Sequence, residues 1–421
     1  MSTQEQINAL IRKHFEEMKD TTDDKSLPLV VAQFGAEEVI EAMDSLLSTY
    51  VTMGKKVKAF ESAFSNYVGR KHGVMVNSGS SAALLAISSL ASPRVSNYIM
   101  KGDEVIYPAI TWPTTILPTS LVGAIPVYVD VDEKTLNMTP DTFENAITDK
   151  TKAVVVTHLL GNPADIVKIK SIADKNDIHV VEDACEAEGA KIGDRYTGSF
   201  GDCSIFSFFL SHHITTMEGG MVVTDNDELV NVLTPKRAHG WIREMDPVVR
   251  KKIEDENPGL DARFLFYENG FNLRPTDIQG AFGMHQLPRL EGYTEKRREI
   301  AKYWNDKLSQ FSEYFYLPLE REGTRHSYFA YQFIIKDDAP FNREDFSKFL
   351  ESRKIQTRPP CGGNLLRHPN LLDPSYEYLV SGELINAPKD NALFVGLHHK
   401  ITDAQRDYLV ESVEEFIREK T

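Results

Sequence analysis

Cysteine is scarce in this sequence. The 421 residues include only Cys185, Cys203 and Cys361, which are scattered, without CxxC spacing. An odd count without regular spacing does not indicate a disulfide framework. We therefore expect reduced thiols, as in a cytoplasmic protein.

Long apolar runs and a basic excess are also missing. Residues 1–20 are polar and amphipathic, without the apolar core of a signal peptide. No stretch approaches the length needed to span a bilayer. The net charge is −15, with Lys and Arg interspersed among acids. Because binding of a phosphate backbone needs a basic surface, we expect no nucleic-acid partner. Because the sequence shows no signal peptide and no bilayer-spanning stretch, we expect no membrane partner and a cytoplasmic location.

The sequence does contain short apolar runs separated by helical patterns. Apolar residues recur at helical spacing over 39–50, 56–67 and from 80 or 81 to 87. Thr139 and Pro140 predict the start of another helix. Apolar strands between helices predict an α/β fold with a mostly parallel sheet covered on both faces. The predicted strands are residues 104–107, 126–131, 153–157, 179–182, 204–208 and 221–224.

The composition changes near residue 290. A long helix of mixed charge, residues 290–308, is followed by the strand-like "YFAYQFII" and by "FNREDFSKFLESR". In the last segment Thr402 and Gln405 form a capping box ahead of an apolar stripe. We predict a large cofactor-binding domain over residues 1–290 and a smaller C-terminal α/β domain over residues 291–421.

Small and hydroxylated residues begin the helix in "NSGSSAALLAI", residues 77–87. The first turn of a helix has free backbone N–H groups at its positive end. Gly79, Ser80 and Ser81 therefore form a candidate phosphate site. By itself, the same pattern also fits an ordinary helix cap.

Asp183 ends a very apolar strand within "VVEDACEAEGA", residues 180–190. A carboxylate at the carboxyl edge of a parallel sheet lies where such folds bind ligands. There it can pair with a protonated ring nitrogen. The alternative is a helix-capping or turn acid.

These two motifs, with "SFFLSHHITTMEGGMVVTD" and "YENGFNLRPTDIQGAFG", occur in an order that resembles the DegT/StrS-type sugar aminotransferases. The stretches "KGDEVIYPAITWPTT", "GAIPVYVDVD" and "VVVTHLLGNPADI" match as well, so the resemblance covers nearly the whole chain. It implies a pyridoxal-phosphate (PLP) enzyme of transferase fold type I, which is like aspartate aminotransferase.

The resemblance also implies residues that bind the cofactor. Gly79, Ser80 and Ser81 hold its phosphate, with help from the hydroxyl of Ser207. Asp183 pairs with the pyridine nitrogen and keeps it protonated, which makes the ring an electron sink.

Three more residues follow from the same resemblance. Trp112 lies against the ring face. Glu186 stands near the ring hydroxyl, where most of the family has Gln. Asn272 reaches the phosphate of the neighbouring subunit's cofactor, which implies a homodimer with shared active sites.

The family's cofactor lysine is missing. Counting forward from Phe206 and back from Glu218 places His212 where the aminotransferases have the lysine that holds PLP as a Schiff base. No lysine occurs between Lys191 and Lys236. Imidazole cannot form that link, but it can move protons. We therefore expect a non-covalently bound cofactor, with pyridoxamine phosphate (PMP) as the form that suits the site.

The exchange of lysine for His212 resembles one branch of the family, the PMP-dependent 4-keto-6-deoxysugar 3-dehydratases of colitose and 3,6-dideoxysugar biosynthesis. The resemblance implies His212 and Asp183 as catalytic residues. The C3 hydroxyl of a nucleotide-linked 4-keto-6-deoxyhexose leaves, and glutamate restores the amine of the cofactor. The nucleotide and the sugar stereochemistry stay open.

Two stretches, "SSAALLAISSLASPRVSNYIMKGDEVI" and "TRPPCGGNLLRHP", look more like an iron–sulfur enzyme of this branch that works with a reductase. That enzyme has a run of cysteines after its "HGW"-like segment, and residues 239–270 contain none here. A four-thiolate cluster needs more cysteine than the chain holds, so we favour the cluster-free reaction. The remaining alternatives are a non-catalytic PLP-binding protein and ordinary sugar amination, which the missing lysine disfavours.

Overall fold

The largest sheet has strands in the order β1-β9-β8-β5-β4-β2-β3-β14. The computed structural model describes residues 2–18, 23–31, 34–369 and 375–421. The strands of this sheet are β1 (His72–Val76), β2 (Glu104–Pro108), β3 (Ile125–Val129), β4 (Thr151–Thr157), β5 (His179–Asp183), β8 (Cys203–Ser207), β9 (Gly220–Thr224) and β14 (Leu379–Val380).

Neighbouring strands from β8 to β14 pair in parallel, whereas β9 is antiparallel to both β1 and β8. The mostly parallel sheet is therefore confirmed. All six predicted strands are present, with ends within two residues of the prediction. Their continuous apolar character reflects burial on both faces, which is typical of parallel strands between helices. β1 and β14 were not predicted.

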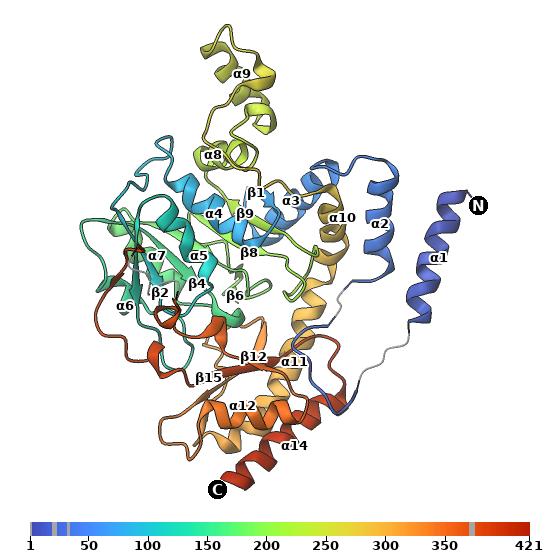
Figure 1. The fold of residues 1–421 in the computed structure, drawn as a ribbon, viewed down its shortest axis with the longest axis vertical. Helices are drawn as coiled ribbons and strands as arrows, with labels where there is room; N and C mark the ends of the chain where they lie inside the picture. Colours follow the sequence, from blue (N-terminus) through green and yellow to red (C-terminus); the bar gives the residue numbers. More distant parts are fainter. Residues whose placement is uncertain (1, 19–22, 32–33, 370–374) are drawn as a thin grey trace.

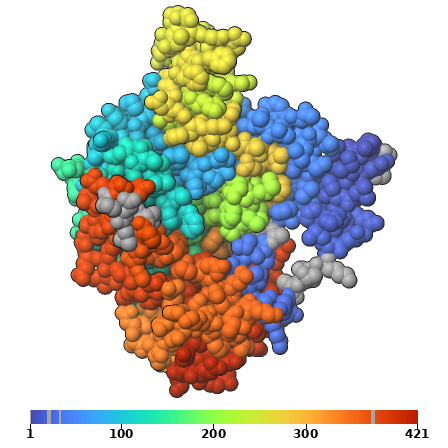
Figure 2. Space-filling view, in the orientation of Figure 1, coloured from blue at the N-terminus to red at the C-terminus, as the bar shows by residue number. Residues whose placement is uncertain are grey.

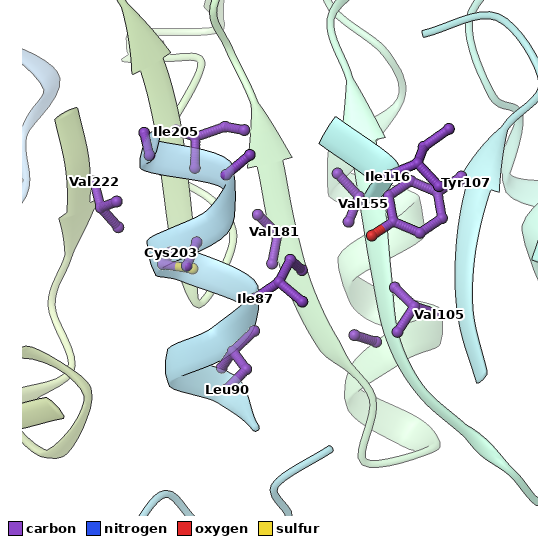
Figure 3. Close-up of a cluster of buried hydrophobic side chains, with 14 of the residues drawn as sticks. Ile87, Leu90, Val105, Tyr107, Ile116, Val155, Val181, Cys203, Ile205 and Val222 are labelled. Carbon is purple, nitrogen blue, oxygen red and sulfur yellow. The ribbon is translucent and has the colours of Figure 1, made fainter. Parts of the chain in front are cut away.

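Helices cover both faces of this sheet (Figure 1). Val105 of β2 and Val155 of β4 belong to the core cluster that also includes α4 and α5, and Val155 lies beside Ile116 of α5 (Figure 3). Their neighbours Ile106 and Val154 pack with Ile169 of α7 on the other face, because successive side chains of a strand point to opposite sides. The helices before residue 290 include α2 (Ala36–Leu47), α3 (Lys55–Val68), α4 (Gly79–Leu90), α5 (Pro113–Leu121), α6 (Pro140–Glu144), α7 (Ile166–Lys175), α8 (Asp227–Arg237) and α10 (Asp277–Gln286).

The C-terminal part has its own antiparallel sheet, in the order β10-β12-β15-β13. Its core includes Trp304, Phe333 and Phe416. The predicted capping box of Thr402 and Gln405 is present. The α/β organisation of this part is confirmed, and the division at residue 290 stays a prediction. The elements are β10 (Phe315–Tyr316), β12 (Ala330–Ile335), β13 (Thr357–Arg358), β15 (Ala392–Gly396), α11 (Leu290–Leu308), α12 (Arg343–Ser352) and α14 (Asp403–Lys420).

Some segments lie outside these layers. α1 (Thr3–Glu17) stands beside α2, and α9 (Pro247–Glu256) belongs to a segment that projects from the body (Figures 1 and 2). A small sheet joins β6 (Lys191–Ile192), β7 (Arg195–Tyr196) and β11 (Thr324–Arg325). Among the helices of the described residues, none combines the length and apolarity that crossing a bilayer requires.

Candidate active site

The carboxyl ends of β5 and β8 lie side by side at one edge of the large sheet. Asp183 ends β5 and Ser207 ends β8, and the two strands are parallel neighbours. α4 begins at the same edge, because a β-carbon added to Gly79 would lie 2.5 Å from the Cβ of Ser207. The predicted phosphate residues and the predicted carboxylate therefore meet where parallel sheets bind ligands.

The amino end of α4 presents backbone donors. Ser78 caps the helix, with its Oγ accepting from the N–H of Ser81 at 3.1 Å. The N–H groups of Gly79 and Ser80 belong to the first turn, where a helix offers no internal acceptor. Together with the hydroxyl of Ser207, they suit a phosphate at the positive end of the helix.

The two predicted serine hydroxyls already make hydrogen bonds. Ser80 Oγ lies 2.7 Å from Thr114 Oγ1, and Ser81 Oγ donates to Asn77 Oδ1 at 2.6 Å. A hydroxyl has one proton to donate. In this arrangement Ser81 offers a phosphate no donor from its side chain, so the backbone groups carry more of this site than the resemblance implied.

Asp183 is buried, with 4 % of its surface exposed. Its Oδ2 accepts from Thr115 Oγ1 at 2.7 Å and its Oδ1 accepts from the N–H of Cys185 at 3.2 Å. These two donors fix the carboxylate and leave further lone pairs for a ring N–H. Thr115 was not predicted, and its position one turn after Trp112 in "WPTT" was the available signal.

Trp112 is the residue immediately before α5, the helix that carries Thr115. Its indole is 56 % exposed. A large exposed aromatic face beside a ligand edge suits stacking on a flat ring.

His212 lies in the turn between β8 and β9. Its ring packs against those of Phe209 and Phe329, with centroids 6.4 Å and 5.3 Å away. Burial lowers the pKa of His212 to about 4, and the charge of Arg297 adds to this, while a hydrogen bond to the backbone of Cys185 opposes it. The imidazole is therefore neutral at pH 7 and able to accept a proton. Phe329 comes from the C-terminal part and was not predicted.

Glu186 lies in the same turn as Cys185, after β5. Its Oε2 accepts from the N–H of Leu160 at 2.8 Å. Burial raises the pKa of Glu186 to about 7, and the negative charge of Asp183 adds to the shift. This carboxyl therefore holds a proton near neutral pH more readily than an exposed glutamate.

Asn272 differs from the other predicted residues because it is exposed. Its Oδ1 accepts from Arg274 Nε at 2.9 Å. The next residue, Leu273, accepts from the N–H of Asn77, which places this segment against the loop before α4. An exposed side chain beside that loop is what a residue acting on a second subunit requires.

These groups fit pyridoxal phosphate or pyridoxamine phosphate. The amino end of α4 and Ser207 suit the phosphate, Asp183 suits a protonated ring nitrogen, and Trp112 suits a ring face. His212 suits proton transfer.

Comparisons with known proteins agree with this chemistry. The model of the DegT/DnrJ/EryC1/StrS aminotransferase family matches residues 33–414. The chain is 37 % identical over 378 residues to the GDP-4-keto-6-deoxy-D-mannose 3-dehydratase of Yersinia pseudotuberculosis, covering 89 % of this chain and 94 % of that protein. It is 36 % identical over 392 residues to the dTDP-4-dehydro-2,6-dideoxy-D-glucose 3-dehydratase of Saccharopolyspora spinosa, covering 90 % and 84 %.

A solved structure of GDP-4-keto-6-deoxymannose-3-dehydratase with a trapped PLP-glutamate geminal diamine has a TM-score of 0.84 to this chain, with 35 % identity. The match covers 92 % of this chain and 100 % of that chain. The predicted fold class, PLP-dependent transferase fold type I, is confirmed. The chain belongs to the DegT/DnrJ/EryC1/StrS aminotransferase family.

Proposed function

We propose that this protein is a PMP-dependent lyase that removes the C3 hydroxyl of a nucleotide-linked 4-keto-6-deoxyhexose. Glutamate transamination returns the cofactor to its amine form. The product is a 3-deoxy-4-keto sugar of the kind used in lipopolysaccharide O-antigens. GDP-linked and dTDP-linked sugars are the substrates in the names of the two relatives above.

The observation that carries this proposal is the position of His212. It lies in the turn after β8 and is hydrogen-bonded to the backbone of Cys185. Cys185 follows Asp183 by two residues in the sequence. The segment between Lys191 and Lys236 offers no lysine to hold the cofactor. The pocket keeps the residues that suit the cofactor phosphate and ring, but it has an imidazole in place of the Schiff-base lysine. This combination supports proton transfer by His212 to and from a cofactor that is not covalently bound.

When bound, the cofactor would supply an amine for the C4 ketone and a ring that takes up electrons. Asp183, fixed by Thr115, accepts the hydrogen bond of the ring N–H and keeps that nitrogen protonated. The ring nitrogen of His212 would accept the proton released at the carbon that bears the cofactor amine and would donate a proton to the departing C3 oxygen. Its lowered pKa makes it a ready donor once protonated. Trp112, with its exposed indole, would cover the ring face, and Glu186, with its raised pKa, would hold a proton near the ring hydroxyl.

The thiols of the chain support the cluster-free reaction over the iron–sulfur variant. Cys203 is fully buried in β8. Cys185 and Cys361 are half-buried, and burial raises the pKa of each thiol well above its usual value. These are poor conditions for thiolates, and three cysteines fall short of the four ligands such a cluster takes.

We also propose that the working unit is a homodimer with shared active sites. Exposed apolar side chains lie on the segments that bear His212 and Asn272, namely Phe209, Met217 and Phe271. Exposed apolar side chains on these segments suit burial against a second subunit. In such a dimer, Asn272 of one subunit reaches the phosphate site of the other.

The test supplies the purified protein with PLP, glutamate and GDP-4-keto-6-deoxymannose. The proposal expects a sugar lighter by one oxygen atom, with one 2-oxoglutarate and one ammonia formed for each sugar consumed. An amino sugar without ammonia release would instead indicate ordinary amination. No interconversion of the cofactor by glutamate would indicate a non-catalytic protein, and turnover only with an added reductase would indicate the iron–sulfur type.

A further inference from the structure

A set of buried ionisable side chains lies behind His212 and takes no part in the chemistry above. Glu188, His213 and Arg297 are exposed by 1 %, 0 % and 2 %. They come from three parts of the chain: the turn after β5, the residue next to His212, and α11. Because such groups are rarely buried without a partner, their arrangement calls for an explanation.

Glu188 and His213 face each other. His213 Nδ1 lies 2.9 Å from Glu188 Oε2, and neither atom makes an aligned hydrogen bond with any described residue. On the other side of the ring, His213 Nε2 lies 3.4 Å from the carbonyl oxygen of Ser327. A carbonyl only accepts, so the ring proton belongs on Nε2 and the lone pair of Nδ1 faces the carboxyl.

The surroundings favour a pair without charge. Burial raises the pKa of Glu188 well above its usual value, opposed by the charge of Arg297 and reinforced by Glu186 and Asp183. Burial also lowers the pKa of His213, helped by the charge of Arg297. One proton therefore stays on Glu188, and the O–H of this carboxyl is the donor that the lone pair of Nδ1 can accept at this separation. A neutral pair avoids the desolvation cost of two buried ions.

The turn that carries His212 is held on its other flank as well. The N–H of Thr215 donates to Gln286 Oε1 at 3.3 Å, and Gln286 Nε2 donates to Glu38 Oε1 at 2.6 Å. Glu38, like the pair, is fully buried. The backbone of this turn is thus fixed from α10 and α2 on one side and has the buried pair on the other.

Phe329 connects the pair to His212. Its ring packs against those of both His212 and His213, with centroid distances of 5.3 Å and 5.9 Å. Rotation of His213 therefore removes support from the phenyl ring that borders His212. Arg297 Nε donates to the carbonyl of Leu397 at 3.1 Å, which fixes the C-terminal side of this arrangement.

We propose that Glu188 and His213 are positioning residues, and that their buried contact holds the imidazole of His212 where it transfers protons. This role rests on the proposed function. It assigns the two residues no contact with the substrate or the cofactor.

The test compares two substitutions at Glu188. Glu188→Gln keeps an N–H donor for Nδ1, whereas Glu188→Met keeps the volume without a donor. We expect kcat for sugar dehydration within about threefold of wild type for the first and lowered at least tenfold for the second, with KM changed less than threefold. His213→Asn and His213→Leu form a second pair with the same expected contrast, should Glu188→Met fail to fold.

A readout independent of turnover is the NMR titration of His212 in the cofactor-free protein. In Glu188→Met we expect its midpoint to move from about 4 toward the usual histidine value, since the freed ring gains solvent. Glu188→Gln should leave it in place.

Glu104→Met is the matched control. Glu104 is a buried carboxyl at the amino end of β2, on the edge of the sheet opposite to the candidate site. Its Oε2 accepts from Thr148 Oγ1 at 2.6 Å. This variant should lower stability without changing kcat or the His212 titration. The positioning role is overturned if Glu188→Met keeps wild-type kcat, or if its kcat falls only in step with the folded fraction. Failure of the wild-type protein to dehydrate the sugar would instead refute the proposed function.

Discussion

Gly79 and Ser207 touch across the edge of the large sheet. A β-carbon at Gly79 would lie 2.5 Å from Ser207 Cβ and 2.7 Å from Ser207 Oγ. Real β-carbons do not approach so closely, so a side chain at position 79 would force either the start of α4 or the end of β8 to move. This contact closes the phosphate site that α4 and β8 build together.

Gly79→Ala should therefore weaken binding of PLP at least tenfold, because it separates the end of α4 from Ser207. The measurement is a titration of the cofactor-free protein with PLP, followed by absorbance. Gly292→Ala is the control, since a β-carbon there meets nothing within 4 Å and lies in α11, far from the site in sequence. Equal affinity for PLP in both variants would show that the contact does not shape the phosphate site.

Asp183→Asn should slow glutamate-driven interconversion of the cofactor by about 10²- to 10³-fold, the range for removal of one preorganised electrostatic contact. An amide cannot hold the ring nitrogen in its protonated state. Thr115→Val removes one donor to the carboxylate and should have a smaller effect. Stopped-flow absorbance measures both rates. A variant Asp183→Asn that reacts as fast as wild type would remove Asp183 from its catalytic role.

Much of the large sheet could be predicted, because parallel strands buried on both faces read as plain apolar runs. β1 was missed because "HGVMV" is short and begins with polar and small residues. The reversed direction of β9 depends on a turn whose geometry the residue pattern does not specify. β14 joins the edge next to β3 from more than 200 residues away in sequence, which no local pattern reveals.

Only part of the candidate site could likewise be predicted from the sequence. Asp183 and the Gly79 turn stand next to strong local signals, a strand end and a helix start, and could be located from them. Phe329 and Arg297 come from beyond residue 290, so their approach to His212 depends on tertiary packing. The occupied hydroxyl of Ser81 is a rotamer choice that sequence does not encode.

Glu186→Gln should change how stability depends on pH in the cofactor-free protein. The folded-state pKa of Glu186 is about 7 and the ordinary value is 4.5, so the folded state binds the proton more tightly. Its contribution is complete below pH 4.5 and is lost as pH rises through 7. The stability of wild type minus that of Glu186→Gln should fall by about 2 to 3 kcal/mol between pH 5 and 8.

Urea unfolding at each pH gives this difference. His212 acts in the opposite direction in the wild type, because its pKa is lowered, but it is present in both proteins and cancels. A difference that stays flat or rises with pH contradicts a protonated Glu186.

Mixed dimers test whether the site is shared. Asn272→Asp places a negative charge against the partner's cofactor phosphate, and His212→Asn removes the base, so each variant alone should be inactive. Random mixing of equal amounts should restore about a quarter of the wild-type activity, because half of the dimers then contain one complete site. Refolding the two variants together and assaying dehydration provides the measurement. No recovery, with dimers formed, would mean that Asn272 serves its own subunit.

The most direct test of the central claim is the dehydration rate of His212→Lys, measured beside borohydride trapping of PLP. A lysine at this position should attach PLP covalently, so that reduction leaves the cofactor on the variant and none on the wild type. Dehydration should be lost, because the tether replaces the free proton carrier. A variant that still removes the C3 hydroxyl at the wild-type rate would contradict the role of His212.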